Sequence, residues 1–106
     1  MKDELLLECV NRDINLTVPW YLITSYLYYR EATPIISDET YDHLCKLMEA
    51  SWFYIKHPHK HLISLDDLKA GTAYAITEYP SRAVRAAHLL LKEEDSKPQT
   101  LEDFFE

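Results

Sequence analysis

Apolar residues recur at helical intervals along most of the chain. Leu5, Leu6, Cys9 and Val10 follow the three- and four-residue spacing of one helix face. Asp3 precedes this run and is the expected N-cap, because a carboxylate at that position accepts a hydrogen bond from a free backbone N–H. The pattern predicts a first helix after Asp3.

A second helix is predicted to start with Thr17 as N-cap and to stop near Ala32. Pro19 is tolerated in a first turn, whereas Pro34 disfavours a helical conformation in the residue before it. The apolar face of this helix consists of Trp20, Ile23 and Leu27.

The third helix has the strongest periodicity in the chain. Ser37 is its expected N-cap, Asp38 and Glu39 lie in the first turn where acids suit the helix dipole, and Pro58 ends it. One stripe of residues is expected to face the core: Tyr41, Leu44, Cys45, Met48, Trp52 and Ile55.

The second half of the chain predicts two further helices. Ser64 caps a short one that ends before Gly71, and "TAYAITEY" after it is either an extended connection or a single strand. Pro80 and Ser81 open the last helix, whose inward residues are Val84, Ala87, His88 and Leu91. The fold class expected is a small all-α, single-domain bundle of four to five helices over residues 1–92, with a flexible acidic tail over 93–106.

Charge divides the chain unevenly. The net charge of the 106 residues is −7; six acids and one lysine lie from Glu93 onward, which leaves twelve acids and ten bases in residues 1–92. The tail is therefore acidic and the body nearly neutral, and neither offers the basic stripe that binding to nucleic acid phosphates requires. Direct nucleic-acid binding is not expected.

Three observations on the sequence bear on location. The sequence has no apolar run long enough to span a membrane, and "MKDELLLECV" is too short and too acidic for a secretory signal. Cys9 and Cys45 both lie in helical apolar patterns, which favours reduced core cysteines over a disulfide or metal pair. We expect a cytoplasmic protein.

The stretch "YLYYREATPIISDETYDHL", residues 26–44, combines aromatic rings with carboxylates. It places three tyrosines in four positions. The acids Asp38, Glu39 and Asp42, together with Tyr41, then follow at the start of the third helix. Tyrosine faces can stack on a cationic ring, and carboxylates can meet its charge. The same residues also fit a turn between two helices that has no ligand, with Ser37 as N-cap and Tyr41 at the start of the core stripe. Both interpretations stay open.

Within this stretch, "LYYREATPIISDETYDHL" resembles the helix-turn-helix signature of the N-terminal Ia domain of NAD-dependent DNA ligases. That signature runs Leu-Tyr-His, a variable turn with a Pro, Ile-(Ser or Pro)-Asp, then Tyr-Asp and a helix. The resemblance implies a module that holds the nicotinamide mononucleotide half of NAD. The contacts that it implies are Tyr28, Tyr29, Asp38, Tyr41 and Asp42.

This chain departs from the ligase pattern in three ways. Tyr29 stands where the family has its His, and no Lys-x-Asp-Gly motif supplies a lysine nucleophile for AMP. No four-cysteine zinc site or helix-hairpin-helix region follows. We therefore expect no ligation and no catalytic residues; an NAD-related cofactor is an alternative only for a binding module.

The last residues, "TLEDFFE", resemble the sliding-clamp-binding tails of T-even-type phage proteins. Those tails have Ser or Thr, Leu and an acid followed by paired bulky apolar residues. The resemblance implies that Leu101, Phe104 and Phe105 enter an apolar cleft of the clamp as the tail folds on binding. The alternative is a tail that folds back on its own domain.

Two other groups of residues are candidates for a metal site or a binding surface. His57, His59 and His61 alternate in "HPHKHL" without a neighbouring Cys or carboxylate, so a solvated loop is favoured over a metal site. Trp52, Phe53 and Tyr54 point in different directions around a helix, so at least one is expected at the surface as a candidate partner patch.

The leading hypothesis from the sequence is a non-enzymatic adaptor. Small acidic proteins of this plan resemble the late-transcription coactivators of T-even-like phages, which implies a sliding clamp for the tail and the RNA polymerase β-subunit flap for the body, in the cytoplasm of a bacterial host. The second hypothesis is a module that binds nicotinamide mononucleotide or NAD, as one part of a split ligase. The third is an acidic inhibitor of a nucleic-acid enzyme.

Overall fold

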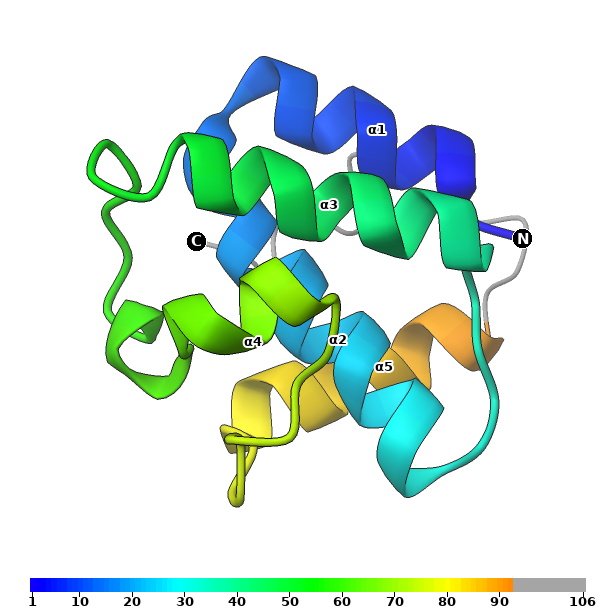
Figure 1. The fold of residues 1–106 in the computed structure, drawn as a ribbon. Helices are drawn as coiled ribbons and strands as arrows, with labels where there is room; N and C mark the ends of the chain where they lie inside the picture. Colours follow the sequence, from blue (N-terminus) through cyan, green and yellow to red (C-terminus); the bar gives the residue numbers. More distant parts are fainter. Residues whose placement is uncertain (93–106) are drawn as a thin grey trace.

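Helix α2 (Thr17–Arg30) lies at the centre of the computed structural model, which describes residues 1–92. Every residue from Thr17 to Ser25 is buried, so this helix is covered on all sides rather than along one stripe. It packs against α3 (Asp38–Ala50) and α5 (Ser81–Lys92), and α3 packs in turn against α4 (Leu65–Ala70) (Figure 1). Around it the described chain adds α1 (Asp3–Arg12) and two short 3-10 turns, Ile14–Leu16 and Lys60–Leu62.

The predicted all-α class is confirmed. The described residues form five α-helices and contain no strand, and "TAYAITEY" is an irregular connection between α4 and α5. Within residues 1–92 no helix combines the length and apolar character that crossing a bilayer needs.

Three predicted helix boundaries are confirmed. The Ser37 hydroxyl accepts a hydrogen bond from the Thr40 N–H at 3.2 Å and caps α3. Ser64 caps α4 in the same way, and Gly71 follows that helix in the left-handed region at φ 74°. A left-handed residue ends a helix with least strain when it is glycine, because glycine has no Cβ to clash.

The two other predicted caps are wrong. Lys2, not Asp3, precedes α1 and has no side-chain cap; Asp3 is the first helical residue, and its carboxylate serves α3 instead. Thr17 is the first residue of α2, and its hydroxyl donates back to the Ile14 carbonyl at 2.7 Å. The partner of Asp3 comes from a distant segment, whereas Thr17 bonds to the 3-10 turn directly before its own helix.

Two predicted faces also need correction. Helix α3 ends at Ala50, and a turn carries Trp52 before Ile55 returns to the core, so the stripe continues past the helix without being helical. The buried residues of α5 are Ala83, Ala86, Ala87 and Leu90, whereas the predicted His88 is exposed. Alanines lie inward because they let α5 approach the tightly buried α2, a preference that hydrophobicity alone does not predict.

The core contains both cysteines as free thiols. Burial raises the pKa of the Cys45 thiol to about 12. Burial also raises the pKa of Cys9, against the opposing effect of a hydrogen bond with Trp20. The predicted core position of both cysteines is confirmed.

Candidate functional site

The candidate site lies where α2 ends and α3 begins. Helix α2 stops at Arg30, and Ala32 adopts a positive φ of 51° that turns the chain. The buried Ile35 and Ile36 then anchor the connection, and Ser37 starts α3. The result is a helical hairpin that holds the last turn of α2 over the first turn of α3.

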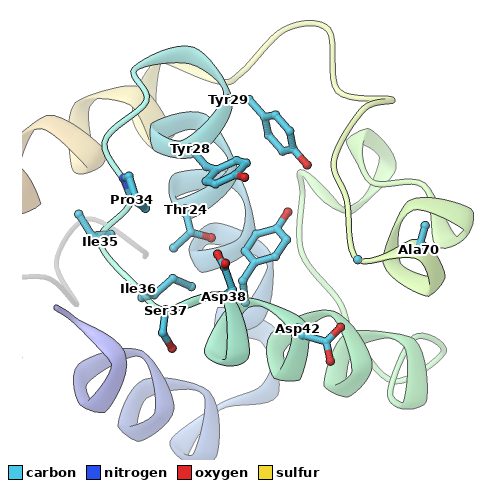
Figure 2. A pocket seen from close by; sticks show the side chains of 12 residues that line it. Thr24, Tyr28, Tyr29, Pro34, Ile35, Ile36, Ser37, Asp38, Asp42 and Ala70 are labelled. Atoms are coloured by element: carbon cyan, nitrogen blue, oxygen red, sulfur yellow. The ribbon is translucent and has the colours of Figure 1, made fainter.

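A cavity of about 280 Å³ opens in this hairpin. All five residues singled out by the ligase resemblance line it: Tyr28, Tyr29, Asp38, Tyr41 and Asp42. Figure 2 shows Tyr28 and Tyr29 projecting from α2, with Asp38 pointing toward Tyr28 from the start of α3. The remaining lining residues were not predicted from the sequence: Thr24, Pro34, Ile35, Ile36, Ser37, Ala70 and Gly71.

Tyrosine rings form one wall of the cavity and continue beyond it. The rings of Tyr28 and Tyr29 meet edge to face with centroids 5.0 Å apart, and Tyr29 meets Tyr74 at 5.4 Å. Tyr28 is 52% exposed and Tyr74 is 74% exposed, so the row of rings ends in solvent on both sides. Tyr74 was missed by sequence reasoning, since nothing in its local pattern links it to a helix that ended more than forty residues earlier.

Tyr41 is held more firmly than the other two lining tyrosines. Its hydroxyl shares a 2.7 Å hydrogen bond with the Ser25 hydroxyl, and its ring stacks on Tyr21 at a centroid distance of 6.0 Å. Burial raises the pKa of Tyr41 far above its ordinary value. Tyr41 therefore presents a neutral ring in a fixed position, as a wall of the cavity and not as a titrating group.

The two carboxylates are exposed and lie one helical turn apart on α3, with Cβ atoms about 5–6 Å apart by helix geometry. Oδ1 of Asp42 lies 3.5 Å from the position that a Cβ would occupy on Gly71. In the part of the chain that the structure describes, neither Asp38 nor Asp42 has a hydrogen-bond or ion-pair partner among the side chains, and no lysine, arginine or histidine lines the cavity.

The predicted partner patch separates into two parts. Trp52 is half-buried beneath Lys60, whose Nζ lies 4.6 Å from the indole ring and donates to the Trp52 carbonyl at 2.6 Å. Phe53 and Tyr54 are 88% and 79% exposed on the turn that follows α3. The exposed part of the patch is thus this pair of adjacent rings.

Histidines of "HPHKHL" form hydrogen bonds within their own loop. The His59 N–H donates to Nδ1 of His57 at 3.1 Å, and Nδ1 of His61 lies 2.8 Å from the Pro58 carbonyl oxygen. Burial, and secondarily His59, lowers the pKa of His57. Across residues 1–92 no group of three or more His, Cys, Asp or Glu side chains is arranged to hold a metal ion.

Leu101, Phe104 and Phe105 lie outside the described residues. Comparison with known proteins gives no further guide: no protein-family model matches the chain, and no match was found among curated proteins or among solved structures.

Proposed function

We propose that this protein is a non-enzymatic adaptor that joins two other proteins. The helical body docks on one partner, and the C-terminal tail binds a sliding clamp. The observation that carries the proposal is the pair of adjacent rings, Phe53 and Tyr54, which are almost fully in solvent on a turn whose neighbour Trp52 is fixed by Lys60. Large exposed rings on a well-anchored turn are typical of binding surfaces, where aromatic residues contribute much of the affinity.

The sequence of the tail supports the second half of the adaptor proposal. Leu101, Phe104 and Phe105 follow the pattern of short clamp-binding tails, and the acidic segment around them suits capture as a peptide. The tail and the small acidic body together resemble phage late-transcription coactivators. On that resemblance, the proposed partner of the body is the RNA polymerase β-subunit flap.

Two truncation and substitution experiments test the two contacts separately. Deleting residues 100–106 should abolish binding to the clamp from the same genome, measured by calorimetry, and should leave helical content and melting temperature unchanged. A loss of the fold on deletion, or equal clamp binding by the intact and truncated chains, would contradict the proposed tail contact.

The body contact is tested with Phe53→Ser/Tyr54→Ser against Arg85→Ser, which shortens an exposed side chain on α5 outside both the ring pair and the cavity. Only the first variant should weaken binding to RNA polymerase, by at least about tenfold for loss of two interface rings. Equal binding by wild type and by the Phe53/Tyr54 variant would argue against this surface.

A small-ligand module is the second candidate, and the cavity favours it. The five residues that the ligase resemblance assigns to nicotinamide mononucleotide converge on one cavity. Two features oppose a tight complex: Tyr29 replaces the family's His, and the described lining offers no base for the phosphate. Calorimetry should give a dissociation constant no tighter than about 1 mM. Micromolar binding that Asp42→Ala weakens would favour this candidate over the adaptor.

A further inference from the structure

The cavity between α2 and α3 carries negative charge without a base to balance it. Asp38 and Asp42 both line it, neither is paired within residues 1–92, and the described lining contains no cationic side chain. An anionic ligand would meet two like charges at close range, whereas a cationic group would meet two acceptors that have no competing partner. The charge of the cavity therefore selects for a cation.

The volume of the cavity limits the size of that cation. Cavities that enclose drug-sized ligands measure about 300–1,000 Å³. At about 280 Å³, this cavity is at the lower end of that range, and Tyr28 in its lining is half exposed. It has room for one long side chain of a partner protein.

Aromatic faces add a preference for a flat cation. Tyr28, Tyr29 and Tyr41 line the cavity, and tyrosine rings attract cations that lie over their faces. The fold already uses this contact once nearby, where the Arg30 guanidinium lies 5.3 Å from the centre of the Tyr79 ring. A guanidinium can stack on such a ring and still donate in its own plane to a carboxylate.

We propose that the cavity receives an arginine side chain from the protein on which the body docks. This inference rests on the adaptor proposal and identifies a second contact of the body, on a different surface from Phe53 and Tyr54. Arginine is favoured over lysine because its five N–H donors can reach both carboxylates, one helical turn apart, while its plane lies against tyrosine. Gly71 keeps the approach to Asp42 open, since it places no side chain beside Oδ1.

The test uses blocked amino acids as probes of the full chain. N-acetylarginine methylamide, N-acetyllysine methylamide and nicotinamide mononucleotide are each titrated into isotopically labelled protein and followed by NMR. The arginine probe should give saturable shifts at Gly71, Tyr28 and Asp42, with a dissociation constant on the order of 1–10 mM for so small a ligand. The lysine probe should bind about threefold more weakly or worse, and the mononucleotide about tenfold more weakly.

A matched pair of variants separates local recognition from general charge. Asp38→Asn/Asp42→Asn should weaken the arginine probe by about tenfold or more, since each carboxylate offers a charge-assisted hydrogen bond. Glu39→Gln removes a negative charge from the same turn of α3 without lining the cavity, and should change the dissociation constant by less than twofold. Both variants are checked for wild-type melting behaviour, and Tyr28→Ala provides an independent loss of the aromatic face.

Each contrary result is decisive. Absence of saturable shifts at the cavity, equal binding of the lysine probe, or equal weakening by Glu39→Gln would overturn the proposal. Tighter binding of nicotinamide mononucleotide than of the arginine probe would also overturn the proposal. A self-association that Asp42→Asn abolishes would do the same, because the cavity would then bind a second copy of the chain. No clamp or polymerase enters these titrations, so their failure leaves the tail and patch experiments intact, and the reverse also holds.

Discussion

The carboxylate of Asp3 accepts a 2.6 Å hydrogen bond from the hydroxyl of Ser37, thirty-four positions along the chain. It also accepts a bond from the Ser37 N–H at 3.1 Å and one from the Thr40 hydroxyl at 2.7 Å. The first turn of α1 thereby fixes the residue that caps α3, next to the cavity. The position of the two cavity carboxylates depends on this contact between distant segments.

Asp3→Asn should destabilise the protein by about 1–2 kcal/mol at pH 7, because it removes the charge from a three-donor acceptor that is only partly buried. Burial acts to raise the pKa of Asp3, but the hydrogen bonds from Ser37 and Thr40 outweigh it and hold the pKa below 3.8. The stabilisation is therefore complete above about pH 3.8 and is lost as the pH falls through the lower folded-state pKa. Urea unfolding at pH 7 and pH 2.5 measures the difference, and Glu4→Gln, at an exposed position in the same turn, is the control; an equal loss for both variants would contradict the assignment.

Ala32→Gly should stabilise the protein by about 0.5–1 kcal/mol. Ala32 has a positive φ of 51°, which costs a residue with a Cβ about 1–2 kcal/mol, partly offset by the greater freedom of glycine in the unfolded chain. Thermal unfolding of the variant should show a higher midpoint. An unchanged or lower midpoint would mean that the turn after α2 relaxes differently.

Gly71→Ala is expected to have the opposite sign, a loss of about 1–2 kcal/mol, because Gly71 has φ 74°. The new methyl group would meet only Oδ1 of Asp42 at 3.5 Å, an ordinary contact, so the strain is in the backbone. The companion variant Gly71→Ala/Asp42→Ala removes the contact between the new methyl group and the Asp42 carboxylate. If this second substitution restores the stability lost in Gly71→Ala, the backbone explanation is wrong.

Glu31 joins the end of α2 to α5. Its carboxylate accepts hydrogen bonds of 2.7 Å from Tyr26 and 2.5 Å from His88. These two bonds, of which the Tyr26 bond has the larger effect, lower the pKa of Glu31 below 4.5. The contribution to stability is present above about pH 4.5 and is lost as the pH falls through the lowered pKa. The melting temperature of Glu31→Gln should therefore fall below that of wild type at pH 7, with the gap closing by pH 3. A gap that is constant with pH would show a purely steric effect.

Neither cysteine should react with thiol reagents in the folded protein. With its pKa raised to about 12, about one Cys45 thiol in ten thousand is ionised at pH 8, and only the thiolate is nucleophilic. Labelling with iodoacetamide, read by mass spectrometry, should be at least 100-fold slower than in 6 M guanidinium chloride, by the order of magnitude of that ionised fraction. Rapid labelling at Cys45 under native conditions would show that α3 opens locally.

The sequence predicted those helix boundaries that are set by residues within one turn. Ser37 and Ser64 as caps and Gly71 as a helix end follow from chemistry within one turn of each residue. Asp3 and Thr17 looked the same in sequence, but the folded chain offers Asp3 the hydroxyl of Ser37, and places Thr17 against the Ile14 carbonyl. The Asp3 partner is thirty-four positions away, so no local pattern reveals it, and the Thr17 partner depends on a 3-10 turn that the apolar pattern does not predict.

The cavity shows the same division. Its five tyrosine and aspartate residues were chosen from one continuous stretch, and they do share a cavity. The opposite wall, Ala70 and Gly71, and the third ring of the row, Tyr74, come from the segment around the end of α4. Small residues without a motif carry no sign of their role until α4 packs on α3.

Because α2 is buried on all sides from Thr17 to Ser25, its amide hydrogens should exchange with deuterium only when the whole domain unfolds. Tyr28 and Tyr29 stand on the final turn of that helix, so one wall of the cavity is attached to the slowest-exchanging part of the molecule. A partner entering there would spend little free energy on ordering that wall. Its association rate should then be set by diffusion and charge steering, with no slow rearrangement before contact.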